Sequence, residues 1–153
     1  MGKIKKISSL KKIITRLKKE NKRIVFTNGC FDLIHPGHIK VLKEAKRQGD
    51  VLVVGLNSDS SVKKIKGKTR PILDEEARAE MLEAIAVVDY IVIFSEENPY
   101  SVIKEIKPDV LVKGGDWSKK EIIGGNLVGK IYRVKLKPSF SSTRIIEKIK
   151  RSA

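Results

Sequence analysis

Short apolar runs alternate with amphipathic segments along the chain. Runs rich in β-branched residues predict strands at about 23–28, 51–57, 90–94, 109–112 and 131–136. Apolar residues at helical spacing predict helices at about 36–48, 59–65, 74–86, 99–106 and 142–151. The strand runs are apolar at successive positions, as parallel strands are when both faces of their sheet are covered.

Capping signals support several of these helix boundaries. Pro36 suits the first turn of its helix, and Gly49 follows shortly after the predicted end. Asp74 can cap the helix that follows it, with Glu75 and Glu76 in the favourable first turn. These signals place the junctions between the predicted strands and helices.

The N-terminal segment predicts one more helix. Ser8 or Ser9 could cap it, and its apolar positions fall at helical spacing: Leu10, Ile13, Ile14 and Leu17. We expect this basic helix, within residues 1–22, to pack on a single domain of residues 1–153.

The alternation of strands and helices predicts an α/β fold. We expect a doubly wound, Rossmann-like parallel sheet of about five strands in the order 3-2-1-4-5. Ligands bind such sheets at the carboxyl ends of the strands, near the point where the strand order reverses. The first predicted strand ends at Asn28-Gly29, so we expect a binding site there.

Composition narrows the class of protein. The chain has 153 residues, of which 41% are hydrophobic and 33% charged, as in ordinary globular domains. No apolar run reaches the length of a membrane span, and the N-terminus has no secretory h-region. The only cysteine, Cys30, suits a reducing compartment. We therefore expect a cytoplasmic protein without a membrane partner.

The net charge of +15 attracts phosphate groups of any kind. A surface rich in solvated lysine explains most of this excess equally well, so the charge does not choose a partner. A nucleic-acid-binding module that uses the basic N-terminal helix is one alternative. Only 5% of the chain is aromatic and no nucleic-acid motif is found, so we expect no nucleic-acid partner.

The run TNGCFDLIHPGH, from Thr27 to His38, carries the clearest chemistry. His35 and His38 project from one side of the first turn of a helix, where unpaired N–H groups and a partial positive charge attract anions. Gly29 allows a sharp turn, and Gly37 is expected to leave room for a base or phosphate. The run therefore predicts a phosphate-binding helix start with two imidazoles.

Other interpretations of the two histidines are weaker. A histidine at a helix start is more often a cap or a surface residue, but here the only two histidines flank Pro-Gly at a predicted strand-to-helix turn. A zinc site lacks a second group of ligands at suitable spacing, and a Ser-His-Asp hydrolase lacks the G-x-S-x-G turn.

The segment GCFDLIHPGH resembles the signature of the H-x-G-H nucleotidyltransferases, the cytidylyltransferase-like family. Further blocks continue the resemblance over about residues 23–150: GDVLVVGLNSDSSVKKIKG (49–67), RPILDEEARAEML (70–82), PDVLVKGGDW (108–117), EIIGG (121–125) and SSTRIIEKI (141–149). Within the family, the pattern is most similar to the adenylyltransferases of ADP-heptose synthesis. Those enzymes are often fused to a sugar kinase, and this chain is expected to act without one.

The resemblance implies a role for each matching residue. His35 and His38 would stabilise charge on the triphosphate, and Lys66 would be the phosphate-binding lysine among those at 63, 64, 66 and 68. The residues implied to bind nucleotide are Thr27, Gly29, Cys30, Phe31, Gly37, Asp116, Ser141, Ser142 and Thr143. Asp32, Asn57, Arg78 and Lys113 are weaker candidates near the acceptor phosphate, and Arg78 could instead pair with Asp74.

The implied reaction is attack of a sugar 1-phosphate, heptose 1-phosphate, on the α-phosphorus of ATP with release of pyrophosphate. The nucleophile is already an anion, so charge neutralisation matters more than a general base. Mg²⁺, bound mainly through the nucleotide phosphates, is the implied cofactor. Cys30 is expected to pack beneath the nucleotide rather than act as a nucleophile.

Alternatives remain at this point. One is a CTP-dependent cytidylyltransferase that acts on glycerol 3-phosphate or another polyol phosphate, and another is a nucleotide sensor without turnover. The family also implies a homodimer, which no residue pattern in the chain tests.

Overall fold

The computed structural model describes residues 2–115, 121–137 and 140–153. Its strands are β1 (Ile24–Gly29), β2 (Val51–Asn57), β3 (Tyr90–Phe94), β4 (Val110–Gly114) and β5 (Lys130–Val134). Its helices are α1 (Ile7–Lys19), α2 (Pro36–Lys46), α3 (Asp59–Lys66), α4 (Glu75–Glu83), α5 (Tyr100–Ile106) and α6 (Ser142–Ser152), with a 3-10 turn η1 (Gly125–Leu127). The predicted alternation of elements is confirmed, with no end displaced by more than three residues.

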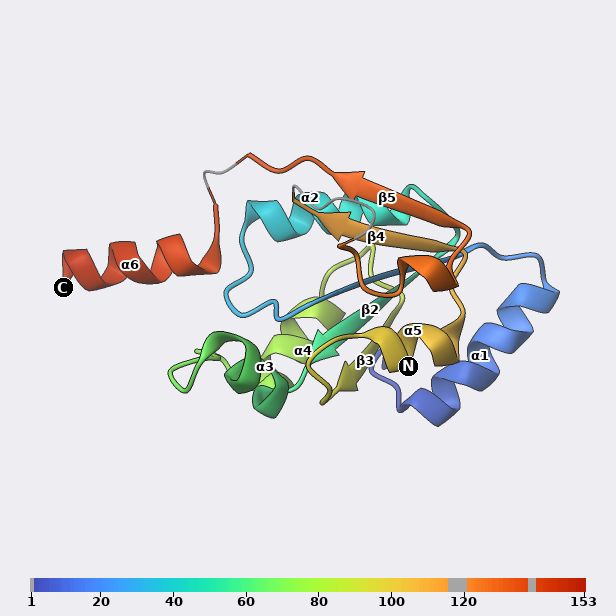
Figure 1. Cartoon of the computed structure of the whole chain (residues 1–153), viewed down its shortest axis with the longest axis horizontal. Helices are drawn as coiled ribbons and strands as arrows, with labels where there is room; N and C mark the ends of the chain where they lie inside the picture. The colour runs from blue at the N-terminus through green and yellow to red at the C-terminus, as the bar shows by residue number, and fades with distance from the viewer. Residues whose placement is uncertain (1, 116–120, 138–139) are drawn as a thin grey trace.

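The five strands form one parallel sheet in the order β3-β2-β1-β4-β5, as predicted (Figure 1). β1 pairs with β2 along its whole length, from Ile24 opposite Val51 to Gly29 opposite Leu56. On its other side β1 pairs with β4, where Val25 lies opposite Val110. The strand order reverses between β1 and β4, so the carboxyl end of β1 is at the switch point of the sheet.

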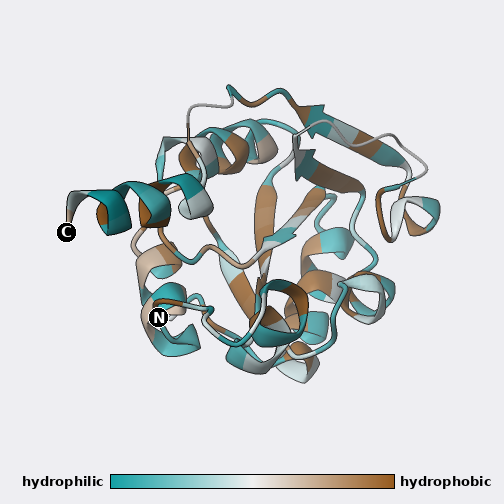
Figure 2. Ribbon diagram, turned by 60° about the vertical axis from the view of Figure 1, so that its left-hand side comes forward, coloured by the Kyte–Doolittle hydropathy of each residue, from teal (hydrophilic) through white to brown (hydrophobic). Residues whose placement is uncertain are grey.

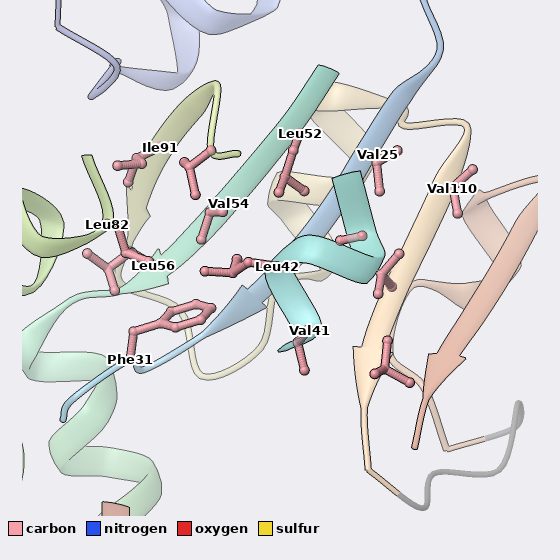
Figure 3. Packing of buried hydrophobic residues seen from close by; sticks show 14 of the residues in the cluster. Val25, Phe31, Val41, Leu42, Leu52, Val54, Leu56, Leu82, Ile91 and Val110 are labelled. Carbon is pink, nitrogen blue, oxygen red and sulfur yellow. The ribbon is translucent and has the colours of Figure 1, made fainter. Parts of the chain in front are cut away.

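Alternate residues of the strands enter two separate hydrophobic cores, because successive side chains of a strand point to opposite faces. On one face, Val25, Leu52 and Val54 pack with Leu42 of α2 and Leu82 of α4 (Figure 3). The opposite face packs against α1 and α5, and its buried residues include Leu10, Phe26, Val53, Ile103 and Leu111. Figure 2 shows the apolar strands at the centre of the molecule, with the helices around them.

The N-terminal helix departs from the predicted cap. α1 begins at Ile7 after Lys6, whose side chain makes no capping bond, so neither Ser8 nor Ser9 is the cap. The reason is a strand-like segment before the helix: Lys5 N–H donates to the Ile91 carbonyl, and Ile91 N–H donates to that of Lys3. This pairing extends the edge of the sheet beyond β3 and starts α1 two residues early.

The first and last helices differ in their packing. α1 buries Leu10 and Ile14 against the sheet, whereas α6 has no buried residue and stands off from the body of the molecule (Figure 1). Ile149, in the middle of α6, is 60% exposed. Among the described residues, no helix is both long and apolar enough to cross a bilayer.

Candidate active site

A cleft of about 380 Å³ opens at the carboxyl ends of the central strands. Asn28 and Gly29 reach it from β1, Asn57 from β2 and Lys113 from β4. Its lining includes these predicted site residues: Gly29, Cys30, Phe31, Asp32, His38, Asn57, Lys66, Lys113 and Ser142. The structure thus brings most of the predicted residues together at the switch point.

We distinguish two walls of this cleft. The helix wall comprises the starts of α2 and α6, residues 35–38 and 141–143. The loop wall comprises Asp32, Lys66 and the connection between α3 and α4, residues 67–74.

Both histidines of the helix wall take part in capping α2, and His38 also lines the cleft. The His35 imidazole accepts a hydrogen bond from Gly37 N–H at its Nδ1 atom (3.1 Å), and His38 Nδ1 accepts one from His35 N–H (3.3 Å). The rings stack with their centroids 3.8 Å apart. Because both Nδ1 atoms are acceptors, the neutral rings carry their protons on Nε2.

Both histidines favour the neutral form. Burial lowers the pKa of His38 to about 4, helped by the nearby His35 and the positive charge of Lys66. Burial also lowers the pKa of His35. His38 lines the cleft, whereas His35 lies behind it, between His38 and Phe140. At neutral pH the helix wall therefore offers an uncharged N–H donor from His38.

Gly37 does not leave the space that the sequence suggested. A Cβ atom at this position would lie 2.8 Å from Cε1 and 3.0 Å from Nδ1 of His35. The imidazole that caps the helix therefore fills this space, and glycine is needed for the histidine rather than for a ligand.

Phe31 shapes the turn between β1 and α2. Its φ of 48° is in the left-handed region, which is costly for a residue with a large side chain. Its ring packs over Gly29, where a Cβ atom would be 3.1 Å from it, and contacts His38 at a centroid distance of 5.2 Å. The ring thus buttresses His38, while the backbone of the turn faces the cleft.

The second helix start of this wall is capped by a serine. Ser141 accepts a hydrogen bond from Arg144 N–H at 3.0 Å, which begins α6. Ser142 lines the cleft, and its hydroxyl donates to the Leu33 carbonyl, joining α6 to the turn before α2. Thr143 is exposed and does not line the cleft.

Two lysines and a cysteine bring positive charge and a thiol to the cleft, in addition to Arg70. Lys66, the last residue of α3, lines it, whereas its neighbours Lys63, Lys64 and Lys68 do not. Lys113 lines it from β4, and burial lowers the pKa of its amine. Burial raises the pKa of the Cys30 thiol despite the cations around it, so the thiol stays protonated and is a poor nucleophile.

The loop wall is organised by Asp32, which is 1% exposed. Its carboxylate accepts hydrogen bonds from the N–H groups of Ile72 and Leu73 and from Nε of Arg70, all between 2.8 and 2.9 Å. Burial alone would raise the pKa of Asp32, but these hydrogen bonds lower it. Asp32 is therefore a charged anchor for the loop rather than a free ligand for phosphates.

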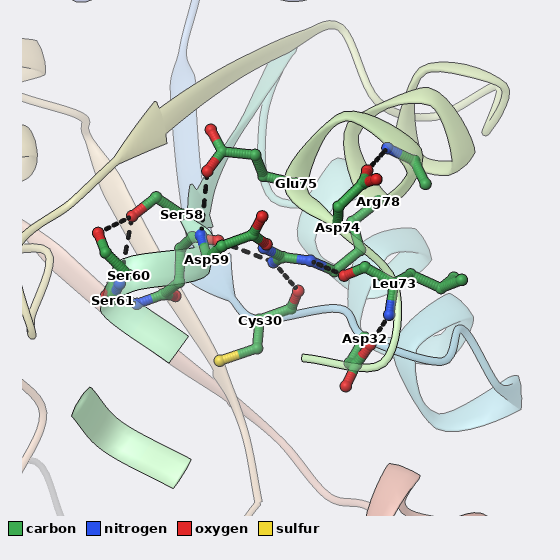
Figure 4. Close-up of polar contacts among 12 residues, drawn as sticks. Cys30, Asp32, Ser58, Asp59, Ser60, Ser61, Leu73, Asp74, Glu75 and Arg78 are labelled. Carbon is green, nitrogen blue, oxygen red and sulfur yellow. Dashed lines mark hydrogen bonds and ion pairs between the residues drawn. The ribbon is translucent and has the colours of Figure 1, made fainter. Parts of the chain in front are cut away.

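Arg78 lies beneath the cleft and not on its wall. It is fully buried, and its guanidinium donates to the carbonyls of Cys30 (2.7 Å), Asn57 (2.7 Å) and Leu73 (3.0 Å) (Figure 4). Its ion pair is with Asp59 at 2.8 Å, so the expected pair with Asp74 is wrong. Asp74 instead caps α4 by accepting from Ala77 N–H, as predicted.

The remaining predicted residues have other surroundings. Thr27 is buried, and its hydroxyl donates to the Val112 carbonyl, which ties β1 to β4 away from the cleft. Asn57 lines the cleft while its amide donates to Ser61. Asp116 lies outside the described residues.

Several lining residues were not predicted from the sequence. Arg70 lines the cleft from the loop wall, Asn28 from the end of β1, and the loop after β3 contributes Glu97, Asn98 and Pro99. Asn28 lies within the run TNGCFDLIHPGH and Arg70 begins the block RPILDEEARAEML, but neither was singled out there. Their proximity depends on strand order, which places the ends of β1, β2 and β3 side by side.

A larger hollow, of about 700 Å³, lies between α1 and α5. Its lining is mostly lysine with Ile14, Thr15, Glu105 and Ile106, and it adjoins Lys107, which precedes β4. We assign the chemistry to the smaller cleft, because it lies at the strand carboxyl ends and contains buried polar groups of several kinds.

Comparison with known proteins agrees with this geometry. The model of the family described as "Cytidylyltransferase-like" matches residues 26–148. The bifunctional protein HldE of Campylobacter jejuni subsp. doylei is 53% identical over 146 residues, and that of Helicobacter pylori strain J99 is 48% identical over 147. These alignments cover 95% and 96% of this chain but 32% of each relative, so the chain spans about a third of their length.

Two solved structures are also similar. The lipopolysaccharide core biosynthesis protein from Thermoplasma volcanium is 31% identical with a TM-score of 0.62, over 76% of this chain and 97% of that protein. Pantoate-beta-alanine ligase from Francisella tularensis has a TM-score of 0.64 at 19% identity, over 98% and 77% of the two chains, which shows a shared fold. With the family model matching most of the chain, this protein belongs to the cytidylyltransferase-like family of nucleotidyltransferases.

Proposed function

We propose that this chain transfers AMP from ATP to heptose 1-phosphate, giving ADP-heptose and pyrophosphate. The observation that carries the proposal is the meeting of two helix starts, α2 and α6, at one cleft that also contains Lys66 and Arg70. The identity to HldE over nearly the whole chain supports the same reaction class. The acceptor rests on the resemblance of the sequence blocks and on a structural relative named for lipopolysaccharide core biosynthesis.

In the proposed reaction, an oxygen of the sugar phosphate attacks the α-phosphorus of ATP. A new P–O bond forms there while the bond to the bridging oxygen of the β-phosphate breaks, and pyrophosphate leaves with that electron pair. The attacking oxygen is already anionic at neutral pH, so the enzyme must mainly bring two anions together and stabilise the charge that develops.

The helix wall suits the triphosphate. Both helix starts offer positive dipole ends, the first turn of α6 adds backbone N–H groups, and His38 adds its Nε2–H, while the Gly37 N–H of α2 is taken by His35. Lys66 reaches the same cleft from the end of α3 and adds a full positive charge. The turn of Gly29, Cys30 and Phe31 would lie against the nucleotide, with Cys30 as a neutral packing residue.

Mg²⁺ is proposed to enter with the nucleotide. In the part of the chain that the structure describes, no three His, Cys, Asp or Glu side chains lie together as a metal site. The acidic residue at the loop wall, Asp32, is already bonded to Arg70 and two backbone N–H groups. The ion would therefore be held mainly by phosphate oxygens, where it would offset their negative charge.

The decisive experiment is a panel of nucleotides and phosphate esters assayed with the purified chain. ATP and CTP would each be paired with heptose 1-phosphate, glucose 1-phosphate and glycerol 3-phosphate. We expect pyrophosphate release to be fastest with ATP and heptose 1-phosphate, with ADP-heptose confirmed by mass spectrometry. Faster turnover of CTP with glycerol 3-phosphate would replace the proposal with the cytidylyltransferase alternative.

The same preparation tests the other classes. Binding of ATP without turnover of any pair would indicate a nucleotide sensor. Tight, steeply salt-dependent binding of DNA or RNA without pyrophosphate release would indicate a nucleic-acid module, for which the lysine-rich hollow between α1 and α5 would be the first surface to test.

Two further points belong to the proposal. A cytoplasmic location is part of the proposal, in keeping with the proposed use of ATP and with a single cysteine. A homodimer remains a prediction, and the exposed Ile149 of α6 offers one apolar contact for it. Sedimentation of the chain and of an Ile149→Lys variant would test that contact.

A further inference from the structure

Arg70 is the feature of the cleft that the proposed nucleotide site leaves unexplained. Its side chain is only 11% exposed, and its Nε donates to Asp32 at 2.9 Å. Its Nη2 atom is buried and has no hydrogen-bond partner. A buried guanidinium N–H without an acceptor is costly, so this geometry favours binding of an anion that accepts its hydrogen bond.

A second unsatisfied group lies in the same cleft. Among the described residues, the buried side-chain atoms without a partner are Nη2 of Arg70 and Oδ1 of Asn28. Both residues line the cleft. A ligand that satisfies both needs an anionic oxygen for Arg70 and a hydrogen-bond donor, such as a hydroxyl, for Asn28. A sugar phosphate carries both groups.

The position of Arg70 separates it from the helix wall. α2 packs mainly over β1 and β4 and also contacts β2 and β5, whereas α3 packs on β2, and the loop after α3 leads on from there. The helix starts at residues 35–38 and 141–143 are already assigned to the triphosphate. Arg70 therefore faces the cleft from the side that remains for the second substrate, with Asn28 between them at the end of the central strand.

The Arg70 guanidinium is held in place before any ligand binds. Asp32 fixes Nε, and the same carboxylate fixes the backbone of Ile72 and Leu73. Arg78, below the cleft, holds the Leu73 carbonyl together with that of Cys30, so the loop is tied to the turn after β1. This network is preorganised. A lysine at position 70 lacks the Nε–H that Asp32 binds, so Asp32 could not orient it in the same way.

We propose that Arg70, oriented by Asp32, binds the phosphate of the acceptor sugar phosphate, while Asn28 accepts a hydrogen bond from one of its hydroxyls. The inference deepens the proposed function and rests on it. Asp32 acts as a positioning residue: it touches Arg70 and the loop, and its effect on the acceptor passes through that guanidinium.

The test is kinetic and uses Arg70→Lys. The matched control is Arg47→Lys, at the exposed arginine that directly follows α2. With heptose 1-phosphate as acceptor, R70K should raise its KM about 10- to 100-fold, the range for losing a charged hydrogen bond. The KM of ATP should change less than threefold, and R47K should change neither. A rise confined to the KM of ATP, or no change in a folded R70K protein, would overturn the inference.

Asp32 is tested by a double-mutant cycle. D32N alone should raise the KM of the acceptor, and adding D32N to R70K should raise it little further, because both changes remove one interaction. A merely structural Asp32 would instead give multiplicative effects in the cycle. Thermal unfolding of each variant shows whether it is folded.

A binding measurement separates this inference from the proposed function. Glucose 1-phosphate is titrated into the ¹⁵N-labelled chain, with the Arg70 side-chain Nε–H resonance as the readout. R70K, which lacks this resonance, assigns it. A shift of the resonance on titration, without turnover of any nucleotide pair, would support the Arg70 site and refute the adenylyl transfer. Turnover with an unaltered acceptor KM in R70K would support the adenylyl transfer and refute the Arg70 site. If the titration gave no shift and no pair turned over, both would be refuted.

Discussion

The two walls of the cleft are built in opposite ways. In the helix wall, capping contacts join residues two or three positions apart, such as His35 with Gly37 and Ser141 with Arg144. In the loop wall, the contacts of Asp32 with Arg70 and with Leu73 span 38 and 41 positions. Local contacts leave a pattern in the sequence, and long-range contacts do not.

Two arginines, Arg70 in the loop wall and Arg78 beneath the cleft, differ in a second way. Arg78 is fully buried with each guanidinium nitrogen bonded, whereas Arg70 is almost as buried but keeps one nitrogen unsatisfied at the cleft. Burial with every donor paired indicates a structural role, and burial with an unpaired donor at a cleft indicates a ligand. The sequence offered Arg78 only as a weaker candidate for the acceptor phosphate, and the unpaired nitrogen points to Arg70 instead.

The largest effect is expected for Arg78→Met. The substitution leaves three buried carbonyls without their donor and Asp59 without its counter-ion, so the free energy of unfolding should fall by about 3–5 kcal/mol. Urea denaturation measures the loss. The exposed Arg47→Met should change stability by less than about 0.5 kcal/mol. A fall below about 1 kcal/mol in R78M would mean that the network under the cleft is not structural.

The fold and the helix wall were predictable because their signals are local. β-branched runs gave the strands and Pro36 gave the start of α2, and the alternation of elements limited the topology to a few arrangements. Asp74 was recognised as a cap from its position before a helical pattern. Each of these predictions depends on contacts within about four residues.

The rest of the site required three-dimensional information. Asp32 looked like a residue beside the phosphates, but its bonds to the loop wall exist only once β1 and β2 are paired. Gly37 looked like space for a ligand, but the His35 ring fills that space. In both cases the sequence located the residue correctly, and a neighbour brought by folding changed its role.

The next effect is on turnover, at the helix wall. His38→Asn keeps a side-chain acceptor for the His35 N–H but removes the Nε2–H donor that lines the cleft. We expect kcat to fall about 10²- to 10³-fold, the scale for one donor to a developing charge, with a melting temperature close to wild type. His35→Asn keeps the cap and should cost less, since His35 lies behind His38. Full activity in both variants would remove the histidines from the mechanism.

The same histidine predicts a pH dependence of stability. The pKa of His38 is about 4 in the folded chain, against an ordinary value of 6.5. Between these values the unfolded state binds the proton and the folded state does not, so stability is lost as the pH falls from 6.5 to 4. Relative to H38N, the free energy of unfolding of the wild type should fall by at most about 3 kcal/mol over this window, because H38N has no imidazole to protonate there. Parallel urea titrations at pH 7, 5.5 and 4.5 would contradict the prediction if the difference between the two proteins stayed constant.

The smallest effects on stability are expected from removing the helix caps of the two walls. Asp74 caps α4, which buries Ala79 and Leu82, whereas Ser141 caps α6, which buries nothing. Asp74→Ala should therefore lower the free energy of global unfolding by about 1 kcal/mol. Ser141→Ala should leave it nearly unchanged, because α6 contributes little packing, yet it should speed hydrogen exchange in the first turn of α6. Equal losses in global stability would mean that α6 packs against the body in solution, and the helix wall would then be as dependent on long-range contacts as the loop wall.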